Sequence, residues 1–243
     1  MSPASLVLIL ASAPAVAQDG PVRILFGHQS VGGNLLEGVR ATAPDVHLGP
    51  GADAGVELLD FLVGENEHPL AKVAAFEQTV QARGASLDAA AMKFCYVDFT
   101  PTTDVEALFV AYEAAHARLR AAFPGLTLAH LTTPLTIVQT GPRAWLKRLL
   151  GRPPAGLLEN QRREAFNQKL RARYQGQEPL FDLARLEATG PDGAPVRYES
   201  SAGATPMLFA GYASDGAHLA PAGQRALGQA FAEFLRTLPR RAR

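Results

Sequence analysis

The sequence has almost no cysteine, since Cys95 is the only one among 243 residues. A single thiol excludes an internal disulfide and any metal site built from several cysteines. Its apolar neighbours Phe94 and Val97 favour a buried thiol in a strand over a reactive one. Ligand spacing such as HExxH is missing around the candidate histidines, so we predict neither a metal nor a cofactor. These histidines are His28, His47, His68 and His130.

An excess of charge of either sign is also missing, because 23 Lys and Arg residues balance 23 Asp and Glu residues. Domains that bind nucleic acid normally carry a basic excess or a dense basic stripe, so we predict no nucleic-acid partner. The one basic cluster, at residues 236–243, is typical of a solvated tail. No apolar run approaches the roughly 20 residues that cross a bilayer, so we also predict no transmembrane segment.

The first residues have the pattern of an export signal. Leu6–Leu10 form a short apolar core, and Ala15-Val16-Ala17 supplies a small-x-small cleavage pattern. No Lys or Arg precedes the apolar core, which leaves a plain N-terminal tail as the alternative. We predict a signal peptide over residues 1–17, one catalytic domain over residues 18–243, and a periplasmic or secreted protein.

From residue 22 onward, short apolar segments alternate with longer stretches of helical periodicity. A polar, glycine-containing stretch is expected at residues 49–68. Strands that are apolar on both faces and separated by helices indicate a parallel sheet covered on both sides. We therefore predict a three-layer α/β/α sandwich with a central parallel sheet, flavodoxin-like in architecture. The expected strands are 22–26, 46–48, 91–99, 126–131 and 180–183, and the expected helices are 31–41, 69–83, 104–119, 158–174 and 221–235.

Reactive groups in such sheets collect in the loops beyond the carboxyl ends of the strands. The first of these loops reads Gly27-His28-Gln29-Ser30-Val31-Gly32-Gly33-Asn34. Ser30 lies where the strand turns into a helix, so it can supply a nucleophile and, through its N–H, one oxyanion donor. The alternative is that Ser30 only caps the helix. The glycines match neither GxGxxG nor GxxxxGK[ST], so they are a weak signal for a phosphate loop.

Near the C-terminus, Asp215 and His218 precede a predicted helix that begins at Pro221. An Asp three residues before a His can bend back and accept the imidazole Nδ1–H. This contact fixes the tautomer and leaves Nε2 free to take a proton from a serine. The alternative is a surface Asp-Gly turn followed by an incidental His.

These two segments together resemble the SGNH (GDSL-like) hydrolase superfamily. In that superfamily the serine follows the first strand, and an Asp-x-x-His lies just before the last helix; the matching residues here are Ser30, Asp215 and His218. The resemblance covers nearly the whole mature chain in element order, including Leu131-Thr132-Thr133-Pro134 and Leu180-Phe181-Asp182. It implies the SGNH hydrolase fold and a Ser30-His218-Asp215 catalytic triad.

The sequence departs from the family pattern around the oxyanion hole. The usual Gly-Asp-Ser is replaced by Gly27-His28-Gln29-Ser30, and no Asn follows the third predicted strand. Asp98 stands there instead and is a candidate residue for facing and positioning the substrate, although an ionised carboxylate would repel an oxyanion. We expect the missing donors at Gly64, through its N–H, and Asn66, through its amide, unless these two residues only shape a turn. His28 is a further candidate, either to polarise substrate or as an alternative base, with a structural role as its alternative.

The segment 136–158 contains Trp145, the only tryptophan. Residues 144–150 are expected to form a short amphipathic helix over the mouth of the site. An exposed Trp145 would suit stacking on a sugar ring, and the nearby bases would suit an anionic substrate or a lipid surface. Alternatively, the segment is a solvated excursion with Trp145 packed onto the domain. The bases are Arg143, Lys147, Arg148 and Arg152.

The predicted function is that of an exported serine esterase that hydrolyses acyl esters, acetyl in the first instance, on a carbohydrate. A lipase or thioesterase of the same fold is the enzymatic alternative. A catalytically silent glycan-binding relative is the alternative of another class. The partner expected in the active case is a small-molecule or glycan ester; the sequence gives no oligomeric state.

Overall fold

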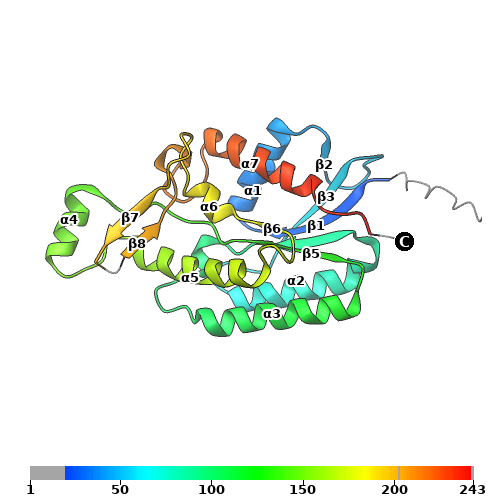
Figure 1. Cartoon of the computed structure of the whole chain (residues 1–243), viewed down its shortest axis with the longest axis horizontal. Coiled ribbons are helices and arrows are strands. Elements are labelled where there is room, and N and C mark those ends of the chain that lie inside the picture. Colours follow the sequence, from blue (N-terminus) through cyan, green and yellow to red (C-terminus); the bar gives the residue numbers. More distant parts are fainter. Residues whose placement is uncertain (1–19, 202, 242–243) are drawn as a thin grey trace, which may run out of the picture.

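The computed structural model describes residues 20–201 and 203–241, so the predicted signal peptide lies outside the described residues. A six-stranded parallel sheet in the order β2-β3-β1-β4-β5-β6 forms the middle layer (Figure 1). Its strands are β1 (Val22–His28), β2 (Val46–Leu48), β3 (Val56–Leu62), β4 (Ala89–Met92), β5 (Thr127–Leu131) and β6 (Leu180–Phe181).

Helices cover both faces of this sheet, and each face has its own apolar core. The helices α1 (Val31–Thr42), α6 (Leu183–Glu187) and α7 (Pro221–Arg236) pack on one face, and α2 (Pro69–Arg83), α3 (Val105–Ala122) and α5 (Leu157–Tyr174) on the other (Figure 1). The predicted three-layer sandwich is confirmed. In the described part of the chain, no helix is both long enough and apolar enough to span a bilayer.

The structure corrects the prediction for residues 49–68, which hold a strand as well as loops. Val56–Leu62 form β3, which pairs with β1 on one side and β2 on the other. Glu57 is buried in this strand, where its carboxylate accepts hydrogen bonds from Arg23 Nε and from two N–H groups of the preceding turn. Because the charge is paired within the fold, an acidic residue is tolerated in an interior strand.

The fourth strand is shorter than the predicted strand at 91–99. After Met92 the chain leaves the sheet and makes a short 3-10 helix at Tyr96–Asp98. The apolar pattern continues because Phe94 stays in the core, where its ring packs against Phe166. Cys95 is a buried free thiol as predicted, although it lies beyond the strand.

Helices α1 and α7 approach each other closely. Gly38 of α1 faces Gly228 of α7, and a Cβ atom on either glycine would overlap the backbone of the other helix. The first helix begins after Ser30, and α7 begins shortly after His218. This close packing brings two segments from opposite ends of the sequence to the carboxyl edge of the sheet.

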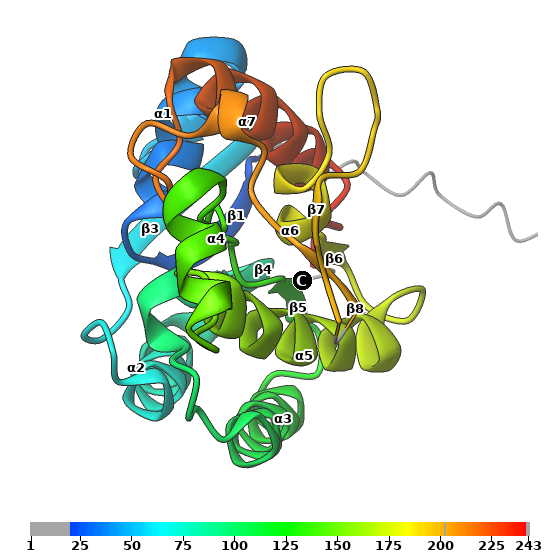
Figure 2. The same ribbon diagram turned by 90° about the vertical axis from the view of Figure 1, so that its left-hand side faces the viewer.

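Two further elements project beyond that edge. Helix α4 (Gly141–Leu149) and the antiparallel hairpin of β7 (Arg197–Ser200) and β8 (Gly203–Pro206) lie on the left of Figure 1 and towards the viewer in Figure 2. The helix agrees with the expectation for residues 144–150, whereas the sequence reading did not predict the hairpin.

Candidate active site

Ser30 occupies the turn between β1 and α1 in a strained backbone conformation. Its φ of 49° and ψ of −107° lie in a region that non-glycine residues rarely adopt. The side chain makes no capping hydrogen bond to α1, although Ser30 holds the N-cap position. Its Oγ lies 2.6 Å from Nε2 of His218 instead. The alternative that Ser30 serves as a helix cap therefore does not hold.

His218 is joined to Asp215 by two contacts. Its Nδ1 lies 2.7 Å from Asp215 Oδ2, and its backbone N–H donates to Asp215 Oδ1 at 2.8 Å. These bonds, the backbone one first, lower the pKa of Asp215 to about 2, although the carboxylate is exposed. An ionised Asp215 favours the tautomer in which Nδ1 carries the proton and Nε2 is free to accept one from Ser30.

The loop that carries His218 is fixed from both sides. Asn34 of α1 accepts a hydrogen bond from the Leu219 N–H through its Oδ1 at 3.0 Å. The carbonyl of His218 accepts from the N–H of Ser214 at 2.9 Å and from its hydroxyl at 3.1 Å. Asn34 closes the motif that contains Ser30, so one short segment supplies both the serine and a restraint on the histidine. The sequence contained Asn34 in that motif, but no signal assigned it this role.

Tyr96 packs against the imidazole of His218 and restricts its orientation. Its ring meets that of His218 edge to face, with centroids 5.6 Å apart. Arg163 of α5 holds Tyr96, because Nε donates to the Tyr96 carbonyl at 3.0 Å and the guanidinium lies over the ring. Burial lowers the pKa of Arg163 to about 10. The sequence pattern had shown Tyr96 only as part of an apolar run.

A buried ion pair joins helix α2 to the segment that follows β4. Lys72 Nζ lies 2.7 Å from Asp98 Oδ2, and both side chains are fully buried. The Asp98 oxygens also accept from the backbone N–H groups of Glu67 and Cys95, and Lys72 donates to Asn66 Oδ1. This arrangement corrects the expectation that Asp98 faces the substrate, since its carboxylate is enclosed and holds the two segments together.

Comparison with solved structures gives matches that span most of the chain. A lipase/acylhydrolase from Enterococcus faecalis covers 91% of this chain and 99% of its own, at 12% identity and a TM-score of 0.51. A protein assigned as a platelet activating factor from Streptococcus pneumonia covers 91% and 86%, at 13% identity and a TM-score of 0.51. One assigned as an SGNH hydrolase from Slackia heliotrinireducens covers 89% and 100%, at 20% identity and a TM-score of 0.49.

The chain has the SGNH hydrolase fold. No protein-family model matches its sequence, and no curated protein matches it either. Identities this low are informative about the fold alone, so the chemistry has to be argued from the residues of the site.

Within the SGNH fold, the candidate oxyanion donors lie beside Ser30. Gly64 lies two residues after the end of β3, and its carbonyl accepts from Gln29 Nε2 at 2.6 Å, which fixes this glycine next to the serine turn. Its φ of 58° favours glycine. Across the described residues, the N–H groups of Ser30 and Gly64 donate no hydrogen bond. Asn66 lies exposed on the same loop.

His28 lies at the end of β1, and its ring contacts Asp60 and Phe26. Its ring is buried, stacks on Phe26, and contacts Asp60 through Nε2 at 3.1 Å. Burial is the main cause that lowers the pKa of His28. A Cβ on Gly32 would overlap this ring, so the glycine is needed to admit it beneath α1. These contacts favour the structural alternative for His28 over a role as base.

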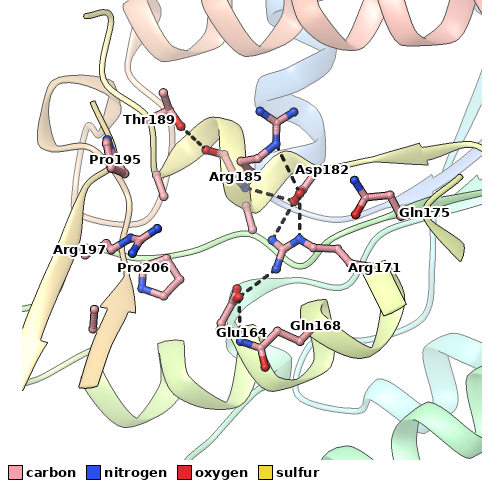
Figure 3. Close-up of a pocket in the computed structure, with 13 residues that line it drawn as sticks. Glu164, Gln168, Arg171, Gln175, Asp182, Arg185, Thr189, Pro195, Arg197 and Pro206 are labelled. Carbon is pink, nitrogen blue, oxygen red and sulfur yellow. Dashed lines mark hydrogen bonds and ion pairs between the residues drawn. The ribbon is translucent and has the colours of Figure 1, made fainter. Parts of the chain in front are cut away.

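A separate hollow of about 420 Å³ lies between α5, α6 and the hairpin (Figure 3). Its wall includes Arg171, but this guanidinium is already paired with Asp182 at 2.8 Å and with Glu164 at 2.9 Å. None of the three predicted triad residues lines it. The hollow in Figure 3 is therefore distinct from the Ser30 site, and its paired charges are accounted for by the packing of α5 on β6.

Proposed function

We propose that this chain is a serine ester hydrolase with Ser30 as nucleophile, His218 as general base and Asp215 as the residue that orients the imidazole. The observation that carries the proposal is the pair of contacts at His218: 2.6 Å from Nε2 to Ser30 Oγ and 2.7 Å from Nδ1 to Asp215. A base within hydrogen-bond reach of a serine, and itself held by a carboxylate, is the arrangement that activates a hydroxyl for acyl transfer.

The reaction runs in two stages. His218 Nε2 takes the proton of Ser30 while Oγ attacks the ester carbonyl, and the N–H groups of Ser30 and Gly64 receive the developing oxyanion. His218 then gives the proton to the departing alkoxide, which leaves an acyl-enzyme and a free alcohol. A water molecule, deprotonated by His218, attacks the acyl carbon; release of the carboxylic acid returns the proton to Ser30.

Within this class, we propose an acetyl or other short acyl ester on a carbohydrate as substrate, acted on outside the cytoplasm. The support is the openness of the site, since the side chains of Asp215 and His218 are 56% and 36% exposed. Such a position accommodates a bulky alcohol such as a glycan chain. The predicted signal peptide supports export.

Hydrolysis of p-nitrophenyl esters from acetate to octanoate, beside acetylated oligosaccharides, tests this proposal. We expect turnover of the acetate and release of acetate from the oligosaccharides. A preference for octanoate would favour the lipase or thioesterase alternative. The absence of turnover on the whole panel, with retained glycan binding, would favour the catalytically silent relative.

The dependence of kcat/KM on pH should show one ionisation on the acid side. Only a neutral imidazole can accept the Ser30 proton, so the rate should fall on the acid side. Asp215, with a pKa of about 2, is already ionised at pH 4 and adds no second step. Initial rates measured between pH 4 and pH 8 check this. A flat profile, or two acid-side ionisations, would contradict His218 as the sole base.

Asp215→Asn should lower kcat by about a hundredfold or more, which corresponds to about 2.7 kcal/mol. The amide cannot stabilise the imidazolium that forms when His218 takes the proton, and it favours the wrong tautomer. Steady-state kinetics measure the loss, and circular dichroism should show an unchanged fold. Asp45→Asn is the matched control, because it removes an exposed carboxylate that forms an ion pair with Arg236 at the surface. If Asp215→Asn is nearly silent, another group orients His218.

A further inference from the structure

Helix α4 presents large apolar side chains to solvent. Trp145, Leu146, Leu149 and Leu150 are 58%, 50%, 67% and 64% exposed. A helix on the surface of a globular domain normally turns its apolar face to the core. Exposed apolar residues that lie next to one another in this way mark a contact with a partner or a membrane.

The apolar face of α4 points away from the domain. Ala144 is the buried residue of the helix and therefore marks the side that rests on the protein. At about 100° per residue, Trp145, Leu149, Leu146 and Leu150 follow one another over an arc of about 140°, centred opposite Ala144. The core of this domain therefore does not use the apolar face, which is open to solvent.

Basic residues border this face on both sides. Arg143 and Lys147 lie beyond Leu150 on the helix surface, and Arg148 lies between Trp145 and Ala144. Arg152 follows the helix, and no acidic residue occurs between positions 133 and 158. Within the described residues none of these four bases forms an ion pair. The surface thus combines an apolar face that contains Trp145 with basic side chains that form no ion pair in the described structure.

We propose that α4 docks this protein on an anionic lipid surface. Its apolar face would enter the boundary between headgroups and acyl chains, with the single Trp145 at the interface and the bases against anionic headgroups. A second copy of the chain is disfavoured as the occupant, because pairing two such helices would also bring their bases together.

Docking through α4 would present the Ser30 site to the membrane. The chain leaves the sheet edge through Ile137, whose N–H donates to the Gly216 carbonyl at 2.8 Å, in the loop that holds Asp215 and His218. It then continues through Gln139 into the projecting helix. The Gln139 N–H donates to the Ala155 carbonyl at 2.9 Å, which joins the segment that leads to α4 to the segment that returns from it. The lipid-binding helix and the catalytic loop therefore face the same end of the molecule (Figure 2).

The fluorescence of Trp145 tests this docking directly, because the chain has no other tryptophan. The full chain is titrated with vesicles of phosphatidylcholine alone and with vesicles containing 30 mol% phosphatidylglycerol. We expect a saturable blue shift with the anionic vesicles, quenching by acyl-brominated lipid, and weakening by salt. Because the signal arises within α4, it separates docking by this helix from attachment through residues 1–17.

Two variants separate the contributions of the apolar and the basic residues to vesicle binding. Leu149→Ser with Leu150→Ser should weaken binding to anionic vesicles about tenfold or more, by removing apolar area from the inserted face. Arg143→Gln, Lys147→Gln and Arg148→Gln together should weaken it about a hundredfold, at about fivefold per base. Val110→Ser is the matched control, since Val110 is 63% exposed on α3, and its binding should equal that of the wild type.

Docking is read out independently of catalysis. Ser30→Ala should bind vesicles as the wild type does, and the leucine variant should keep its rate on a water-soluble ester. Three results would overturn the proposal: a Trp145 emission that no vesicle changes, an equal response to neutral vesicles, or a blue shift that grows with protein concentration in the absence of lipid. The last would assign the face to a second copy of the chain.

Discussion

Ser30→Ala should reduce ester hydrolysis by about 10⁴-fold or more, because it removes the hydroxyl that contacts the Nε2 atom of His218. The variant keeps the oxyanion donors and the substrate surface, so any residual rate measures what these contribute without a nucleophile. Turnover of p-nitrophenyl acetate gives the rate, and intact-mass analysis after treatment with a fluorophosphonate gives the extent of labelling. We expect one label on the wild type and none on Ser30→Ala.

A serine near the amino ends of the strands, opposite the edge of the sheet that holds Ser30, provides the control. Ser86→Ala removes an exposed hydroxyl that bonds to the Arg83 carbonyl near the amino ends of the strands, and it should leave both readouts unchanged. Labelling that persists in Ser30→Ala would contradict the assignment of the nucleophile, however close Ser30 lies to His218. If the wild type is neither labelled nor active, the protein would instead be a catalytically silent relative that keeps the hydrogen bonds among Ser30, His218 and Asp215.

Lys72→Met should lower the free energy of unfolding by about 3–5 kcal/mol, which is typical when one partner of a buried ion pair is removed. The substitution leaves the enclosed Asp98 carboxylate with two backbone N–H donors and without its ion-pair partner. Urea unfolding measures the loss. Turnover should also fall, because this ion pair holds the loop with Gly64 in place beside Ser30.

Combining Lys72→Met with Asp98→Asn separates the loss of the pair from general damage to the core. Because the second change removes the charge that the first leaves unpaired, the double variant should lose less stability than the two single variants together, by about 1 kcal/mol or more. Strict additivity would contradict the proposed coupling. Asp98→Asn alone should destabilise the protein and is not expected to restore an oxyanion donor, because its amide would be enclosed next to Lys72.

The layer architecture could be predicted from the sequence because its determinants are local. Alternating apolar segments and helical periods encode α2 over Pro69–Arg83 in full, and proline at the first turn sets its start. Strand β3 could not be predicted in the same way. Its acidic Glu57 is buried with the help of a counter-charge, Arg23, which lies 34 positions earlier on the neighbouring strand.

For the site, residue types at the ends of predicted elements were sufficient to nominate Ser30, Asp215 and His218, and the structure brings these three together. Their catalytic roles stay predictions. The roles of Asn34 and Asp98 depend on contacts between distant loops. A carboxylate at a strand end has the same appearance in the sequence whether it faces a substrate or a buried Lys72.

The contact between Gly38 and Gly228 also determines when the Ser30–His218 pair can form during synthesis and folding. Ser30 and His218 are separated by 188 positions, so a growing chain exposes its serine long before the histidine has been synthesised. If the proposed mechanism holds, the hydroxyl would have no proton acceptor until α7 docks against α1. Activity would therefore switch on in a single late event of folding, and a chain that stalls or is cut before α7 would be harmless to the esters around it.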